Sequence, residues 1–280
     1  MTPPALHVDL GWGADAIRAL AADTPTAHTT PHAAGSDSVT VVVIDVLSFS
    51  TAVDVATARG AIVFPWHEGG PSAVEAAQER QAVLAANRTA TATATATSPW
   101  TLSPASLQTI PPGTRLLLPS PNGATISGIA RAQGRRTVAG CLRNASAVGH
   151  WLAQTGGRVL LVPAGEWTRS SAHGVGTDVW RTALEDWLGA GAIATVLQGH
   201  GATLTPEAQD AAARFARCVS DLRTHLSRCA SGRELIERGF RDDVHLAAQH
   251  DVSSCVPLLE DGVGDGVGDG YSNANAAPSA

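Results

Sequence analysis

The sequence predicts an α/β fold of three layers, in which helices cover both faces of a mostly parallel or mixed sheet and the C-terminal part is helical. Short apolar segments rich in β-branched residues alternate along the chain with segments of helical periodicity. This alternation is typical of consecutive βα units. One apolar segment, residues 41–47, is interrupted only by Asp45, as expected for a strand buried on both faces.

The elements follow one another in a regular order. A short alternating segment at residues 7–10 predicts a strand, and residues 14–22 predict a helix. Strands are then expected where β-branched residues cluster, at residues 39–46, 60–65, 115–118, 136–139 and 158–162. Helices are expected between them, at residues 50–59, 72–81, 124–133 and 145–154.

The C-terminal part turns helical, with helices expected at residues 179–189, 206–229, 232–238 and 242–250. The helix at residues 206–229 offers an exposed face for a possible homodimer. Residues 24–38 are expected to form a loop, and the Thr-Ala repeat within residues 88–100 an exposed low-complexity insertion. The Gly-Asp repeat and small residues of 263–280 predict a disordered tail, because they bury too little apolar area to offset the entropy of ordering. A single domain over residues 1–262 remains.

Composition excludes several classes of protein. With 280 residues the chain can bury a sizeable core, and its net charge of −6 argues against a nucleic-acid partner. We find no apolar run long enough to cross a bilayer and no apolar signal core, so we expect no membrane partner. The four cysteines stand far apart without a Cys-x-x-Cys pair. This pattern predicts a cytoplasmic protein rather than a disulfide framework or a zinc site.

Asp45 is the first candidate for a functional residue. A carboxylate at the C-terminal end of a buried strand is costly to bury unless a metal or another cation accompanies it. Ligands of open α/β sheets also bind at that end of the strands. The alternative is an aspartate that caps the next helix or pairs with a buried arginine.

Two later turns, at residues 118–125 and 140–146, join a strand to a helix through Ser, Asn and Gly. Backbone amides at a helix start, with glycine allowing a close approach, suit a phosphate or a sulfonate. The alternative is that these residues are plain helix caps. The candidate phosphate ligands in the two turns are Ser120, Asn122, Gly123, Arg143, Asn144 and Ser146.

Acidic residues supply the other half of the predicted site. Glu166 follows a fourth strand, and Glu185 and Asp186 stand side by side in an apolar helical segment, so at least one of these two should be buried. The alternative is that they pair with Arg181 or another surface cation. Asp45, Glu166 and one of Glu185 or Asp186 would form an all-oxygen site, which suits Mg²⁺ better than zinc.

Several catalytic motifs are absent. The sequence contains no phosphate-binding Gly-x-x-x-x-Gly-Lys-Ser/Thr run, no Gly-x-Ser-x-Gly segment and no cysteine-phosphatase spacing. If the chain cleaves a phosphate ester, a metal-activated water is therefore the simplest mechanism. Asp45 and Glu166 are the residues that we expect to act in catalysis.

Six segments, taken in order, resemble the 2-phosphosulfolactate phosphatase family. They are Val-Ile-Asp-Val-Leu at 43–47, Ser-Pro-Asn-Gly-Ala-Thr at 120–125, Gly-Cys-Leu-Arg-Asn-Ala-Ser at 140–146, Pro-Ala-Gly-Glu at 163–166, Leu-Glu-Asp-Trp-Leu-Gly at 184–189 and Ser-Gly-Arg-Glu-Leu at 231–235. The resemblance implies an α/β/α phosphatase that uses Mg²⁺ to convert 2-phospho-3-sulfolactate into 3-sulfolactate and phosphate, a step towards coenzyme M. It places Asp45, Asn122, Asn144, Glu166, Glu185 and Asp186 in the family's motifs.

The chain departs from the family pattern at Ser48, where family members often carry an arginine, and around residues 85–88, which lack a Gly-Glu-Arg-Gly-Gly pattern. An arginine at position 48 would clamp an anion, and we hypothesise that Arg143 takes over that role. The alternative function is a non-catalytic protein that binds a small phosphorylated or sulfonated acid. Ser48 favours this alternative, whereas the retained acids disfavour it, because buried acids without a cation are costly.

Overall fold

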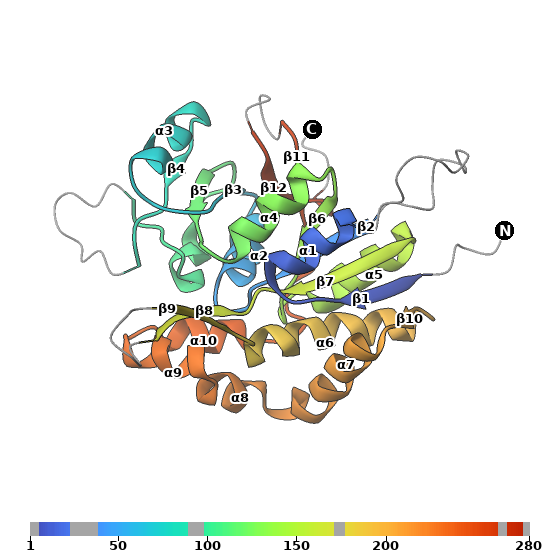
Figure 1. Ribbon diagram of the computed structural model, residues 1–280. Helices are drawn as coiled ribbons and strands as arrows, with labels where there is room; N and C mark the ends of the chain where they lie inside the picture. The colour runs from blue at the N-terminus through green and yellow to red at the C-terminus, as the bar shows by residue number, and fades with distance from the viewer. Residues whose placement is uncertain (1–5, 23–38, 89–97, 171–176, 263–267, 277–280) are drawn as a thin grey trace, which may run out of the picture.

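The computed structural model describes residues 6–22, 39–88, 98–170, 177–262 and 268–276. Within them, ten strands form one mixed sheet (Figure 1). Its order from edge to edge is β10 (Thr203–Leu204), β1 (His7–Leu10), β7 (Arg158–Pro163), β2 (Val39–Ile44), β6 (Arg136–Ala139), β11 (Pro257–Glu260), β12 (Gly270–Asn273), β3 (Ile62–Trp66), β5 (Arg115–Pro119) and β4 (Val83–Leu84). The prediction of an α/β fold is confirmed.

The sheet consists of two parallel groups joined by an antiparallel hairpin. The first group contains β10, β1, β7, β2 and β6, and the second contains β3, β5 and β4. Between them, β11 and β12 pair antiparallel with each other, with β6 and with β3. At the centre of the first group, Val42 of β2 lies opposite Val138 on one side and Leu161 on the other.

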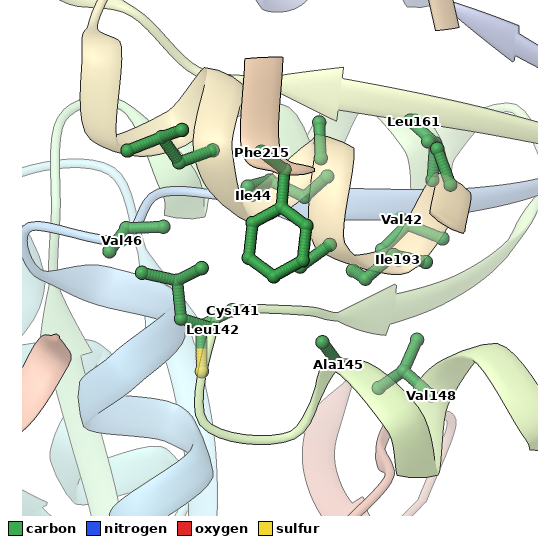
Figure 2. Close-up of a cluster of buried hydrophobic side chains, with 14 of the residues drawn as sticks. Val42, Ile44, Val46, Cys141, Leu142, Ala145, Val148, Leu161, Ile193 and Phe215 are labelled. Atoms are coloured by element: carbon green, nitrogen blue, oxygen red, sulfur yellow. The ribbon is translucent and has the colours of Figure 1, made fainter. Parts of the chain in front are cut away.

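Helices cover both faces of the sheet because the strand side chains alternate between two cores. Val42 and Ile44 face one core, which α5 (Ala145–Thr155), α6 (Leu184–Gly199) and α7 (Pro206–Cys218) cover. Figure 2 shows the ring of Phe215 from α7 among these side chains. Val41 and Val43 face the other core, which α1 (Gly13–Ala22), α2 (Phe49–Ala58) and α4 (Gly123–Ala132) cover. A smaller cluster joins α3 (Pro71–Glu79) to β3 and β5.

The helices α6 and α7 pack unusually closely. A Cβ atom at Gly191 of α6 would lie 2.1 Å from the carbonyl oxygen of Ala211 in α7. Only a glycine therefore lets the two backbones approach each other this way. Beyond them lie α8 (Leu222–Arg228), α9 (Ala230–Glu237) and α10 (Arg241–Ala247), on the same side of the sheet as α6 and α7 (Figure 1).

Two C-terminal helices differ from the sequence-based expectation. Residues 206–229 do not form one helix: α7 ends at Cys218, and α8 begins after Asp221, whose carboxylate accepts a hydrogen bond of 3.3 Å from the Thr224 amide. Such a cap competes with a continuous helix. The helix expected at 179–189 is wrong at its start, because β9 (Thr177–Arg181) pairs with β8 (Glu166–Ser170) in a separate hairpin and α6 begins at Leu184.

The C-terminal tail also differs from the prediction of disorder. Strand β12 lies inside the sheet, and its Tyr271 is fully buried. The Tyr271 ring contacts the Phe49 ring edge to face, and its hydroxyl shares a 2.8 Å hydrogen bond with Ser127. One aromatic side chain thus anchors a polar segment, because it completes a core already lined by α2 and α4. Residues 263–267 and 277–280, like the expected loop at 24–38 and residues 89–97 of the insertion, lie outside the described residues.

In the described part of the chain, no helix has both the length and the apolar composition needed to cross a membrane.

Candidate active site

A cavity of about 690 Å³ opens beside the ends of β2 and β5, a size typical of small-molecule sites. The loop after β2, the loop after β3, the residues after β4, the loop before α4, the start of β8 and one side of α9 all contribute to its wall. Its charged and ionisable side chains are those of Asp45, His67, Glu68, Arg88, Glu166, Glu234 and Arg238. Ser120 and Asn122, two of the phosphate ligands expected from the sequence, also line it.

Asp45 lies directly after β2 and is almost completely buried. Its Oδ1 accepts a hydrogen bond of 3.2 Å from the Phe49 amide, and its Oδ2 accepts one of 3.0 Å from the Gly123 amide. Burial nevertheless raises the pKa of Asp45 to about 6, and the nearby Glu185 carboxylate adds to this effect. Asp45 therefore accepts a hydrogen bond from the first residue of α2, which is close to the capping alternative considered from sequence. Its carboxylate also lines the cavity, where its raised pKa favours a bound proton or cation.

Gly123 contributes its backbone rather than a wall of the cavity. A Cβ atom at this position would lie 2.3 Å from Cδ1 of Phe49. Without a side chain, the start of α4 lies against Phe49 and its amide reaches Asp45. Asn122, the residue before, lines the cavity and makes no side-chain capping hydrogen bond at this helix start.

Glu166 is the second carboxylate on the cavity wall. Burial and the negative charge of Asp45 raise its pKa to about 7, while Arg181 acts in the opposite direction. The preceding Gly165 has a φ of +68°, and a Cβ atom there would lie 2.5 Å from the Trp180 ring. This turn thus requires a glycine, and it positions Glu166 beside Asp45.

Asp186 holds the two acidic loops together. Its Oδ1 accepts a hydrogen bond of 2.7 Å from the Val46 amide, and its Oδ2 accepts one of 3.0 Å from the Gly165 amide. Asp186 therefore ties the loop that carries Asp45 to the loop that carries Glu166. Burial and the neighbouring Glu185 raise the pKa of Asp186 well above its ordinary value. Because Asp186 does not line the cavity and both its oxygens accept hydrogen bonds from the two loops, we assign it a positioning role.

Glu185 lies behind the cavity wall and is only 2 % exposed. Its Oε2 has no hydrogen-bond partner among the described residues. Its charge raises the pKa values of Asp45, Glu166 and Asp186, so the four acids form one electrostatic cluster. Both Glu185 and Asp186 are buried, whereas the sequence predicted this for at least one of them. Arg181 bonds to Ser231 instead of to either acid.

The cluster has the donor chemistry of a magnesium site. All its donors are carboxylate oxygens, and one buried oxygen lacks a partner, which a divalent cation nearby would offset. No group of three or more His, Cys, Asp or Glu side chains in the described ranges is arranged as a ready metal cage. Mg²⁺ commonly binds one or two carboxylates and keeps several waters, and Asp45 and Glu166 on the cavity wall fit that mode.

Arg88 is a cavity residue that the sequence did not single out. Its side chain is 11 % exposed and donates hydrogen bonds to Ser48 Oγ at 2.7 Å and to the Leu102 carbonyl at 2.8 Å. Its Nε has no partner within the described part of the chain. The guanidinium of Arg88 therefore lies against Ser48. In sequence it is an isolated residue at the edge of a Thr-Ala repeat, which no spacing pattern identifies.

The turn at residues 140–146 is placed elsewhere. Arg143 forms an ion pair with Asp54 at 2.9 Å and donates a hydrogen bond to Gln249. Asn144 is fully buried, and its side-chain oxygen accepts a hydrogen bond from the Cys141 amide. Ser146 donates hydrogen bonds to the carboxylate of Asp251. Residues 251–253 also bond to the backbone of this turn. None of the described residues that line the cavity comes from it. The geometry therefore does not favour Arg143, Asn144 and Ser146 as phosphate ligands, and it places Arg88 rather than Arg143 beside Ser48.

Comparison with protein families identifies a match over most of the chain. The family model of 2-phosphosulpholactate phosphatase matches residues 24–262 of the chain. This range contains all the cavity residues described above. No curated protein gives a significant match.

Proposed function

Because the chain belongs to the 2-phosphosulpholactate phosphatase family, we propose that it hydrolyses 2-phospho-3-sulfolactate to 3-sulfolactate and phosphate in a Mg²⁺-dependent reaction. Membership of this family makes the chain a phosphoric monoester hydrolase. The proposal of substrate and metal rests on one observation: two carboxylates with raised pKa values share a cavity with a buried arginine and the start of a helix.

The cavity suits a small molecule that carries several negative charges. The start of α4, with Asn122 and Ser120 on the cavity wall, is suited to phosphoryl oxygens. Arg88 adds a positive charge to the cavity wall, where it attracts an anion, while its Nη2 donates to Ser48 and Leu102. A phosphate monoester without another acidic group would leave the charge of Arg88 only partly compensated, by Asp243 at 3.8 Å, so we expect the substrate to carry a second acidic group.

Asp45 and Glu166 would hold Mg²⁺. When bound there, the ion would lower the pKa of the attacking water and neutralise charge on the phosphoryl oxygens. Residues of the chain itself orient the two carboxylates and bind the phosphoryl group. The amides of Phe49 and Gly123 orient Asp45, and Asp186 keeps Glu166 beside it. Asn122, on the cavity wall, would donate its side-chain amide hydrogens to the phosphoryl group.

The non-catalytic alternative rests on Ser48, which removes an arginine from the loop after β2. Arg88 supplies a guanidinium at Ser48 from another part of the chain. The departure at position 48 therefore does not argue for loss of turnover, and we retain only the enzymatic function.

Release of inorganic phosphate tests the proposal. The substrates are racemic 2-phospho-3-sulfolactate and a small panel of other phospho-hydroxy acids, each with Mg²⁺ or with EDTA. The variants are wild type, Asp45→Asn and Asp210→Asn, the last being an exposed acid on α7 that serves as the control. We expect Mg²⁺-dependent release that is lost in Asp45→Asn and kept in Asp210→Asn. Undiminished release in EDTA would reject the metal, and preference for another panel member would reject the substrate.

A further inference from the structure

Two arginines of the cavity wall share one aromatic ring. The guanidinium carbon of Arg88 lies 5.2 Å from the ring centroid of Phe240, and that of Arg238 lies 5.9 Å from the same centroid. Arg88 follows β4, whereas Arg238 directly follows α9. Two segments that are 150 residues apart in sequence thus bring two cations together, and both line the cavity.

The two guanidinium groups are close enough to repel each other. Burial and the charge of Arg238 both lower the pKa of Arg88, while Asp243 acts in the opposite direction. Asp243 only partly compensates Arg88, because its Oδ2 is 3.8 Å away and has no hydrogen-bond partner among the described side chains. An anion between the two cations would remove this repulsion.

Arg238 has a counter-ion that a ligand can replace. Its Nη1 lies 3.0 Å from Oε1 of Glu234, one turn earlier on the same helix, and the two side chains are 43 % and 60 % exposed. Exposed ion pairs of this kind contribute little stability. A ligand anion can therefore displace Glu234 at small cost.

We propose that Arg88 and Arg238 form a second anion site in the cavity, which binds the acidic group of the substrate that does not react, a sulfonate or a carboxylate. The inference rests on the proposed function and deepens it, because it divides the substrate between two ends of the cavity. The phosphate lies at the start of α4, near Asp45 and Glu166, and the other acid lies between the arginines. The pair thus selects phosphate esters that carry a strong acid.

Opposite effects of two neighbouring substitutions test this site. Arg238→Gln should raise the KM for 2-phospho-3-sulfolactate by about 10- to 100-fold, the usual contribution of a hydrogen-bonded charge. The KM for 4-nitrophenyl phosphate, which lacks the second acid, should rise much less. Glu234→Gln removes the competing carboxylate and should lower the KM for the sulfonated substrate. Arg233→Gln, which changes an exposed arginine of the same helix outside the cavity, should leave both KM values unchanged.

Calorimetric binding of 3-sulfolactate and of inorganic phosphate separates this inference from the proposed reaction. Arg238→Gln should weaken 3-sulfolactate binding about tenfold or more, and should weaken phosphate binding much less. Equal weakening of both ligands, or no weakening of 3-sulfolactate, would overturn the second site. If no substrate releases phosphate but 3-sulfolactate binding still depends on Arg238, the reaction is wrong and the anion site stands.

Discussion

Asp45 accepts a hydrogen bond of 3.0 Å from the amide of Gly123, although the two residues follow strands of different parallel groups in the sheet. Three successive antiparallel pairings separate these groups. The contact therefore joins the loop after β2 to the start of α4 at the cavity. It depends on the missing side chain at position 123, because the Phe49 ring occupies the space that a Cβ atom would fill.

Gly123→Ala should destabilise the protein and impair catalysis. The added methyl group would displace Phe49 or α4, an overpacking that costs about 1–3 kcal/mol, and would disturb the hydrogen bond to Asp45. Gly128→Ala is the matched control on the same helix, since nothing lies within 4 Å of its Cβ position. This control should raise the free energy of unfolding by up to about 1 kcal/mol. Urea unfolding and phosphate release measure both effects, and equal behaviour of the two variants would contradict the proposed contact.

Asp186→Asn should lower the free energy of unfolding by about 1–3 kcal/mol. The backbone amides of Val46 and Gly165 now donate to the two carboxylate oxygens. An asparagine keeps only one of these oxygens, so its NH₂ group would face one of the two backbone amides and break that hydrogen bond. Because these two loops carry Asp45 and Glu166, phosphate release should fall as well. Denaturant unfolding measures the stability, with Asp210→Asn as the exposed control. A loss of activity without any loss of stability would speak against the positioning role.

The metal-free protein should become less stable as the pH rises. Burial raises the pKa of Asp45 to about 6 and that of Glu166 to about 7, above their ordinary values of 3.8 and 4.5. At pH values between the ordinary and the raised pKa of each group, the folded protein binds more protons than the unfolded chain. The free energy of unfolding therefore falls as the pH increases through this range. Thermal unfolding in EDTA between pH 4.5 and 8 measures this decline. It should be smaller in Glu166→Gln, and identical slopes would refute the contribution of Glu166.

Tyr271 should be important for stability, although it lies in a polar, glycine-rich tail. Tyr271→Ala removes a fully buried aromatic ring that packs against Phe49, and should cost about 3–5 kcal/mol. Tyr271→Phe loses only the hydrogen bond to Ser127 and should cost about 1 kcal/mol. Ser272→Ala, at the half-buried neighbour whose hydroxyl donates a hydrogen bond of 3.2 Å to Glu260, should cost only about 0.5 kcal/mol. If Tyr271→Ala were as mild as Ser272→Ala, β12 would not be part of the sheet in solution.

The sequence by itself determined the parts of the protein that depend on neighbouring residues. The apolar segment around Asp45 predicted β2, and the alternation of elements predicted the α/β fold. Asp45, Asn122 and Glu166 were identified because each follows a predicted strand, and the structure brings all three to one cavity. Such features are local, because periodicity and turn residues report on a few adjacent positions.

Only the tertiary structure decided which of these strand ends meet a ligand. The turn of Arg143 has the same local design as that of Asn122, but residues 249–253 cover it. Arg88 donates a hydrogen bond to Ser48, and both Arg88 and Arg238 lie against the ring of Phe240. The segments that carry these two arginines contain no sequence motif that would predict the contacts. Strand β12 enters the sheet through one tyrosine. These contacts join residues far apart in the chain, and their stability comes from burial and charge that exist only once the segments have packed together.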